Sequence, residues 1–378
     1  MTIRNCRVCA QSFFKEPLLR YENMPRAAQH FPDEASLEAE RGVNLTVCQC
    51  SECGLVQLSE PPVHYYRDVI RAAAVSEPVK AFKTEQFSRL VEKYGLQGKK
   101  VIEIGCGKGE FLSLWKSLGV HVYGLEHAEI SVKHCVGNGL CVFQGYLDAS
   151  ELQLPNGPFD AFALLMFLEH MPDPNASLRG IHNNLVEDAV GLIEVQNFDM
   201  VVRNHVFSEF IADHLLYFTR ETLQFTLQLN GFEILECSEL RDDYVLSAIV
   251  RKRKSLDLSD FHAAQDSVRQ EIETFIDRFP PRSVAIWGAG HQALAMISLT
   301  GIADKIKYVV DSAPFKQGKF TPASHLRIVS PDTLKLSPVS ALIVMAASYS
   351  DEVAGIVRQR HGDDLPLSIL RESHLEIV

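Results

Sequence analysis

Four cysteines in two matched pairs are the first residues of this chain that could do chemistry. Cys6 and Cys9 form one Cys-x-x-Cys spacing, and Cys50 and Cys53 form a second. Four thiolates in such pairs typically close a structural zinc ion tetrahedrally and leave it no position for a substrate. Cys48 is a fifth thiol nearby, which we expect to be a spectator. The spacing predicts one structural Zn²⁺ near the N-terminus.

Glycines at alternate positions mark a second candidate site. The sequence reads Glu-Ile-Gly-Cys-Gly-Lys-Gly over residues 103–109, directly after a short apolar run. Such a turn lets the backbone approach a ligand closely, and the helix beyond it presents unpaired N–H groups. Glu126 ends the next expected strand, where a carboxylate can accept hydrogen bonds from both hydroxyls of a ribose. The combination predicts a domain that binds a nucleotide-like cofactor.

Asp213 and His214 are adjacent ionisable residues within a largely apolar segment, residues 207–218. A histidine with a pKa near neutral pH can take a proton, and a neighbouring carboxylate can orient it. The alternative is that His214 caps a helix expected to begin at Thr219.

The glycine turn resembles the first motif of class I S-adenosylmethionine-dependent methyltransferases, in which an acid precedes the glycines. The resemblance covers about residues 100–195. It continues in Val-Tyr-Gly-Leu-Glu at 122–126, Phe-Asp-Ala-Phe at 159–162 and Glu-His-Met-Pro-Asp-Pro at 169–174. It implies a Rossmann-like α/β core and S-adenosyl-L-methionine as the cofactor.

This resemblance assigns six residues to the cofactor: Glu103, Gly105, Gly107, Glu126, Tyr146 and Asp148. The two glycines would line the methionine portion, and the Glu126 carboxylate would bind the ribose diol. Either Tyr146 or Asp148 would flank the adenine. His170 we expect to be structural or cofactor-lining rather than a general base.

Over its whole length the chain resembles the sugar-nucleotide C-methyltransferases. That family has a zinc-binding N-terminal domain, a methyltransferase core and a C-terminal Rossmann-like domain in this order. The corresponding residues here are 1–75, 76–254 and 255–378. The matching positions are the four paired cysteines with residues 54–58, Asp213-His214 with Tyr217-Phe218, and Asp311, Lys316-Gln317-Gly318 and Pro331.

The family resemblance implies a mechanism and a substrate class. His214 would abstract the proton beside a keto group, and Asp213, in the place of a family glutamate, would position it. The acceptor would be a nucleotide-linked keto-deoxysugar or a related carbohydrate.

The family pattern is altered at three places around the acceptor. Ile211 replaces a tyrosine, and residues 241–244 read Arg-Asp-Asp-Tyr where the family has His-Gly-Gly-Ser. A second family tyrosine, in the segment after the zinc region, has Tyr65, Tyr66 or Ile70 as its possible counterpart.

The same residues are compatible with other functions. The same base could deprotonate a hydroxyl, so an O- or N-methyltransferase on another small-molecule acceptor is the first alternative. A dinucleotide-dependent oxidoreductase would use Gly288-Ala289-Gly290, but Ala293 stands where a third glycine is expected. A non-catalytic scaffold is the remaining alternative.

The elements that must position these residues follow an alternating helix and strand pattern, typical of parallel α/β sheets. We expect strands at about residues 100–104, 121–125, 159–165, 191–195, 231–235, 244–250, 283–287, 306–310 and 341–345. We expect helices at about residues 81–94, 110–118 and 261–279. Residues 1–75 show little apolar periodicity, so we expect the metal to stabilise them.

The amino-acid composition limits which partners the protein is expected to have. The net charge of −11 argues against a nucleic-acid partner, for which a basic face is expected. No apolar run approaches the roughly 20 residues needed to cross a bilayer, and no signal sequence is evident. We therefore expect a cytoplasmic enzyme with a small-molecule substrate and reduced thiols. The sequence does not indicate an oligomeric state.

Overall fold

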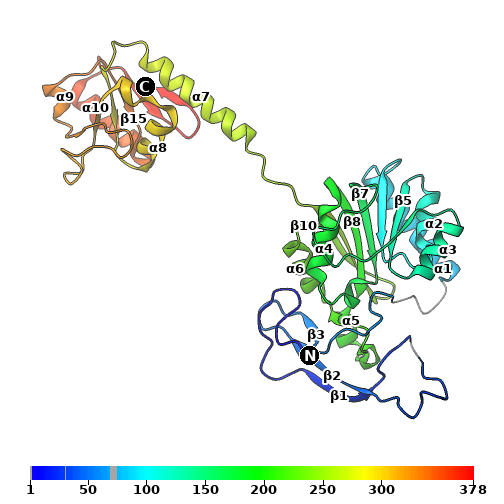
Figure 1. The fold of residues 1–378 in the computed structure, drawn as a ribbon. Coiled ribbons are helices and arrows are strands. Elements are labelled where there is room, and N and C mark those ends of the chain that lie inside the picture. Colours follow the sequence, from blue (N-terminus) through cyan, green and yellow to red (C-terminus); the bar gives the residue numbers. More distant parts are fainter. Residues whose placement is uncertain (1, 30, 69–74) are drawn as a thin grey trace. The chain divides into compact units, whose positions relative to one another are not determined.

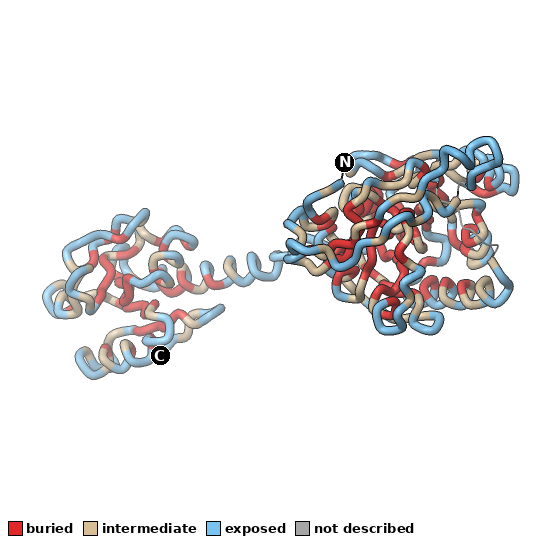
Figure 2. Tube along the Cα trace, turned by 90° about the horizontal axis from the view of Figure 1, so that it is seen from below, coloured by how far each residue is buried: buried red, intermediate tan, exposed pale blue. Residues whose placement is uncertain are grey.

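The computed structural model describes residues 2–29, 31–68 and 75–378. It divides the chain into two compact units, Met1–Lys254 and Ser255–Val378, each with its own sheet. Figure 2 shows the buried residues gathered in the interior of each unit. Among the described residues, no helix combines the length and apolar character needed to span a bilayer.

A seven-stranded sheet forms the centre of the first unit, in the order β10-β11-β8-β7-β4-β5-β6 (Figure 1). Its parallel strands are β4 (Lys100–Ile104), β5 (His121–Glu126), β6 (Val142–Gln144), β7 (Phe159–Leu165) and β8 (Leu185–Gln196). Its last two strands, β10 (Phe232–Leu240) and β11 (Val245–Lys252), form an antiparallel hairpin beside β8. The expected α/β class and Rossmann-like core are confirmed.

Helices cover both faces of this sheet. The helices of the first unit are α1 (Glu77–Lys93), α2 (Glu110–Ser117), α3 (Glu129–Gly137), α4 (Pro174–Asn183), α5 (Phe198–Arg203) and α6 (Arg220–Leu229). On one face, Phe87 of α1 stacks on Trp115 of α2 with ring centroids 4.0 Å apart, above Ala163 of β7. On the other face, α4 and α6 pack their leucines against β7 and β8. Alternate residues of β7 thus face opposite cores.

The N-terminal segment contains a four-stranded antiparallel sheet that the sequence did not reveal. Its strands are β1 (Leu19–Met24), β2 (Val43–Gln49), β3 (Val56–Leu58) and β9 (Leu216–Tyr217). β3 and β9 have only three and two residues, too few to show an alternating pattern. Because β9 directly follows Asp213 and His214, this sheet joins the cysteine segment to the candidate acceptor segment.

The second unit has a six-stranded sheet in the order β14-β13-β12-β15-β16-β17, parallel except for β17. Its strands are β12 (Val284–Trp287), β13 (Ile306–Val310), β14 (Ile328–Val329), β15 (Ala341–Val344), β16 (Leu367–Leu370) and β17 (Leu375–Ile377). Its helices are α7 (Ser259–Ile276), α8 (His291–Thr300), α9 (Thr333–Leu336) and α10 (Ser350–His361). Two apolar clusters cover the two faces of the sheet, so this unit has a complete core.

Candidate active site and metal centre

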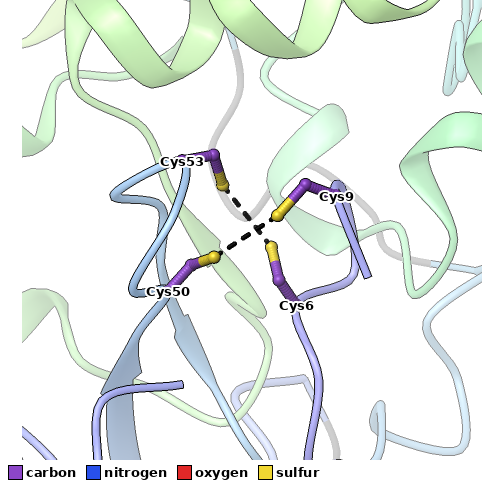
Figure 3. A group of neighbouring side chains, drawn as sticks. All are labelled: Cys6, Cys9, Cys50 and Cys53. Atoms are coloured by element: carbon purple, nitrogen blue, oxygen red, sulfur yellow. Dashed lines mark hydrogen bonds between the residues drawn. The ribbon is translucent and has the colours of Figure 1, made fainter. Parts of the chain in front are cut away.

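The four paired cysteines lie together. All four Sγ atoms are within 4.8 Å of one another, and Figure 3 shows their side chains pointing toward a common centre. The Sγ atoms of Cys6 and Cys53 are 3.7 Å apart, and those of Cys9 and Cys50 are 3.3 Å apart. A tetrahedral ion with metal–sulfur bonds of about 2.3 Å separates its sulfurs by about 3.8 Å, so the spacing fits zinc.

Two hydrogen-bond donors beside the cluster would stabilise negative charge on the Cys6 sulfur. The side-chain amide of Gln57 donates to the Cys6 Sγ at 3.2 Å, and the Val8 amide donates to the same atom at 3.4 Å. Donors in the surroundings of a metal ligand orient it and stabilise its charge. Cys48 lies in β2 and is not part of the group of four.

The glycine turn connects β4 to α2. Gly105, Gly107 and Gly109 have φ angles of 69°, 56° and 79°, in the left-handed region that glycine adopts without strain. A Cβ on Gly105 would lie 2.8 Å from the ring of Phe167, so a side chain there would also collide. Glu103 is buried in β4, ahead of the turn.

Glu126 is held by this turn. One of its carboxylate oxygens accepts from the Gly107 amide and the other from the Ala128 amide, each at 2.8 Å. Burial raises the pKa of this carboxyl, and the two backbone donors oppose the rise. Each oxygen retains a lone pair, so the carboxylate can still accept a ribose hydroxyl at each oxygen.

Tyr146 and Asp148 follow β6 on the same side of the site. The Tyr146 ring packs edge-on against Phe167 at 6.2 Å between centroids, and its hydroxyl has no hydrogen-bond partner among the described residues. Burial raises the pKa of this hydroxyl. Asp148 forms an ion pair with Arg67 at 2.6 Å. Of the cofactor candidates, Gly105, Glu126 and Tyr146 line one small cavity.

Asp213 is buried, and its carboxylate binds groups other than the neighbouring imidazole. The Tyr65 hydroxyl donates to it at 2.6 Å, and the Ala28 amide donates to it at 3.1 Å. The expected hydrogen bond from Asp213 to His214 is not present among the described residues. The buried Tyr65 hydroxyl needs an acceptor, and the carboxylate supplies it.

His214 faces His170. Their ring centroids are 4.8 Å apart, and the His170 Nδ1 lies 2.8 Å from the Asp213 carbonyl oxygen. The Nδ1 of His214 is buried without a hydrogen-bond partner among the described residues. Burial, together with the nearby His170, lowers the pKa of His214 to about 3. The expectation of titration near neutral pH is therefore wrong, because desolvation disfavours the charged imidazole.

The helix-capping alternative for His214 is also wrong. The N-cap of α6 is Thr219, whose hydroxyl accepts from the Thr222 amide at 3.2 Å in a reciprocal capping box. His214 lies ahead of β9, well before that helix.

Three residues of the site were missed or left open by the sequence. Tyr65 was one of three possible counterparts of a family tyrosine, and the structure places it on Asp213. Ile70, another of the three, lies outside the described residues. Arg67 carried no sequence signal, because its position beside Asp148 depends on a long-range contact. Glu169 was quoted only within a motif; it is fully buried, and burial raises its pKa to about 8.

Comparison with known proteins decides the family. Residues 77–237 match the model of a methyltransferase domain, and residues 251–362 match that of a C-methyltransferase C-terminal domain. This chain is a class I S-adenosylmethionine-dependent methyltransferase. The second match identifies it as a methyltransferase of the C-methyltransferase type.

Two curated relatives and one solved structure are similar to this chain. The C-methyltransferase NovU of Streptomyces niveus is 22% identical, over 93% of this chain and 91% of its own length. A ubiquinone biosynthesis O-methyltransferase of Pseudomonas aeruginosa is 30% identical over 33% of this chain, and the match spans about half of that relative, 55%. The PH0226 protein of Pyrococcus horikoshii is a solved structure with 15% identity and a TM-score of 0.41, covering 50% of this chain and 98% of its own.

Proposed function

We propose that this methyltransferase acts on a carbon atom of a nucleotide-linked keto-deoxysugar or a related carbohydrate. The observation that carries the proposal is a C-methyltransferase C-terminal domain in the same chain as a buried imidazole whose Nδ1 has no hydrogen-bond partner among the described residues. Enolate formation beside a keto group requires a positioned proton acceptor, and this nitrogen is the candidate. The similarity to an O-methyltransferase is confined to about a third of the chain.

In this proposal His214 removes the proton from the carbon beside the keto group. Its Nδ1 has no hydrogen-bond partner among the described residues and can accept a proton, and the neutral form is the one present at working pH. Asp213 acts as a positioning residue. Its carboxylate anchors the Tyr65 hydroxyl and its carbonyl oxygen contacts His170, so it fixes the groups around the base.

The cofactor would be held by the turn between β4 and α2. Glu103, Gly105 and Gly107 would line its methionine portion, and Glu126 would accept the ribose hydroxyls. Either Tyr146 or Asp148 would flank the adenine. S-adenosylmethionine supplies the electrophilic methyl group, and the residues of the chain bring it and the enolate carbon into line.

Zinc would be structural in this enzyme. Four cysteines complete the tetrahedron, so the ion has no open position for an acceptor. Its proposed role is to hold the two cysteine-bearing loops against the sheet that contains β9.

Hydrogen exchange in the substrate tests the proposal. The enzyme is incubated in D₂O with S-adenosylhomocysteine and each of a panel of nucleotide-linked keto-deoxysugars, and NMR follows the hydrogen beside the keto group. We expect exchange with wild type and none with His214→Asn. Absence of exchange across the panel, with methyl transfer to a hydroxyl oxygen in a parallel reaction that contains S-adenosylmethionine, would favour the O-methyltransferase alternative.

A further inference from the structure

A cavity of about 500 Å³ lies beside the first cysteine pair, where no motif assigned a ligand. Its lining comes from residues 3–10, from Ser150 and from residues 172–179, which include the beginning of α4. Neither Glu126 nor His214 belongs to this lining. Pockets for small ligands typically measure about 300–1,000 Å³, so the cavity is large enough to hold part of a substrate.

Arg7 is the first of two cations in the lining. Its Nη2 donates to the Glu60 carbonyl oxygen at 2.6 Å, and its Nη1 donates to the Pro172 carbonyl oxygen at 3.4 Å. Its Nε is buried and has no hydrogen-bond partner among the described residues. Burial lowers the pKa of this guanidinium, and the charges of Glu60 and Cys6 only partly oppose the change. The Nε of Arg7 is therefore left to donate to a further acceptor.

Arg179 is the second cation, and it lies on α4 with an exposed side chain. It forms no ion pair or side-chain hydrogen bond within the part of the chain that the structure describes. The carboxylate in the lining belongs to Asp173, which caps α4 by accepting from the Ala176 amide at 2.9 Å. The lining thus carries two positive charges and one negative charge, in a chain whose net charge is −11.

Two guanidinium groups on one cavity favour a ligand with several negatively charged oxygens. A guanidinium is planar and presents its N–H donors as a fork, which matches the oxygens of a phosphate group. A diphosphate offers one phosphoryl group to each fork. The lining therefore fits a diphosphate better than it fits a neutral sugar.

The loop after β7 connects this cavity to the proposed base. At one end of the loop, His170 faces His214, with ring centroids 4.8 Å apart. Three residues later Asp173 lines the cavity, and three residues span at most about 11 Å. In a nucleotide-linked sugar the diphosphate is bonded to the sugar ring itself. This spacing allows one acceptor molecule to occupy both places.

We propose that the cavity binds the diphosphate of the nucleotide-linked acceptor, held between Arg7 and Arg179. The sugar ring then extends along the loop past His170 toward His214. This inference rests on the proposed function for the identity of the acceptor. The competing role for Arg7 is only to balance the negative charge of the neighbouring cysteines, and that role does not involve Arg179.

The test measures ligand binding to the full-length, zinc-loaded enzyme by calorimetry, with inorganic pyrophosphate as the first probe. We expect wild type to bind pyrophosphate and Arg179→Gln to bind it roughly tenfold more weakly. This factor is the lower end for a charge-assisted hydrogen bond, because Arg179 is exposed. Arg89→Gln is the matched control, since Arg89 is an exposed arginine on α1 outside the cavity. It should bind pyrophosphate as wild type does.

A second set of probes separates the diphosphate from the nucleoside. Uridine diphosphate and thymidine diphosphate are compared with the corresponding nucleosides, which lack both phosphoryl groups. We expect Arg179→Gln to weaken binding of the diphosphates and to leave binding of the nucleosides unchanged. Arg7→Lys keeps the positive charge beside the cysteines but removes the forked donors, so it should also weaken pyrophosphate binding. Metal analysis of Arg7→Lys checks that its zinc is retained, and if zinc is lost the Arg179 comparison alone decides.

Two results would overturn the diphosphate subsite: wild type that does not bind pyrophosphate, or Arg179→Gln that binds it with wild-type affinity. Failure of the proposed function has a different signature. In that case pyrophosphate binding would depend on Arg179, while no nucleotide-linked keto-deoxysugar would show hydrogen exchange. If both inferences are correct, Arg179→Gln should raise the KM for the nucleotide-linked sugar by a similar factor and change kcat little.

Discussion

His214 combines an imidazole that stays neutral with a ring nitrogen that has no partner among the described residues. Its pKa of about 3 means that protonation does not compete with base function above about pH 5. An ordinary histidine with a pKa near 6.5 would be half protonated at pH 6.5 and almost fully protonated at pH 5. Burial therefore keeps the imidazole in the neutral form that can accept a proton, and the same desolvation makes it a weaker base than an ordinary histidine.

His214→Asn should preserve cofactor binding and slow methyl transfer by about 10²–10⁴-fold, the usual contribution of a positioned general base. The wild-type rate, followed by mass spectrometry of the methylated product, should show no rising limb near pH 6.5. Calorimetry with S-adenosylhomocysteine provides the control for cofactor binding. A variant with near-wild-type turnover would remove His214 from the mechanism.

Glu169 is the most buried carboxyl beside the acceptor segment. Its Oε2 has no hydrogen-bond partner among the described residues, and burial raises its pKa from 4.5 to about 8. Between these two values the unfolded chain releases the proton and the folded chain keeps it. The free energy of unfolding therefore falls as pH rises through this window, by at most about 1.4 kcal/mol per pH unit.

Glu169→Gln should abolish most of this dependence, because the amide is neutral at every pH. Urea denaturation of wild type and variant at pH 5 and pH 8 measures it. We expect wild type to lose more stability than the variant between the two pH values. Parallel losses would show that Glu169 is ionised in the folded enzyme.

At the scale of elements, the group of four cysteines adjoins a sheet in which β3 and β9 have only three and two residues. Cys50 begins the turn between β2 and β3. Its amide donates to the Leu55 carbonyl oxygen at 3.0 Å, and β3 begins directly after Leu55. Because β3 pairs with β9, a change in this turn should also disturb the segment that holds Asp213.

Cys50→Ser should therefore lower zinc content below one ion per chain and reduce the melting temperature. Cys48→Ser is the matched control, since Cys48 is a buried cysteine in the neighbouring strand but outside the cluster. It should keep one zinc per chain. Metal analysis by mass spectrometry measures both. Zinc retained by Cys50→Ser, or lost from Cys48→Ser, would contradict the ligand set.

The elements that the sequence predicted well are those with long apolar runs and glycine boundaries. β4 and β7 have the expected ends, because each is a buried run that stops at a turn. β8 is longer than expected at both ends, since it begins with partly exposed residues that carry no buried-strand signal. The glycine turn and Glu126 were placed together because both lie at the ends of adjacent parallel strands.

Contacts between distant segments could not be predicted from the sequence. Tyr65 and Asp213 are far apart in the chain, and their hydrogen bond depends on the sheet that joins β3 to β9. The Arg67–Asp148 pair has the same origin. Because Asp213 and His214 are adjacent, the sequence suggested a hydrogen bond between them. The carboxylate instead accepts from the Tyr65 hydroxyl and the Ala28 amide, which are distant in the chain.

At the scale of the whole molecule, the second unit has an apolar core made entirely of its own residues. Both clusters that cover its sheet draw only on residues after 255. A fragment of residues 255–378 should therefore fold alone, with helix and strand content by circular dichroism and a cooperative thermal transition.

The buried side chains of α7 allow an estimate of how much this helix contributes to the stability of the second unit. Four of its side chains are buried in the unit: Val268, Ile272, Phe275 and Ile276. Burying each contributes roughly 1.5–3 kcal/mol, so α7 supplies about 6–12 kcal/mol as an upper value. The stability of a domain is itself only about 5–15 kcal/mol. A fragment of residues 281–378, which lacks α7, should therefore be unfolded or barely stable, while 255–378 unfolds cooperatively. Equal thermal transitions for the two fragments would show that the sheet does not depend on α7. Absence of a transition in 255–378 would show that this unit requires the rest of the chain.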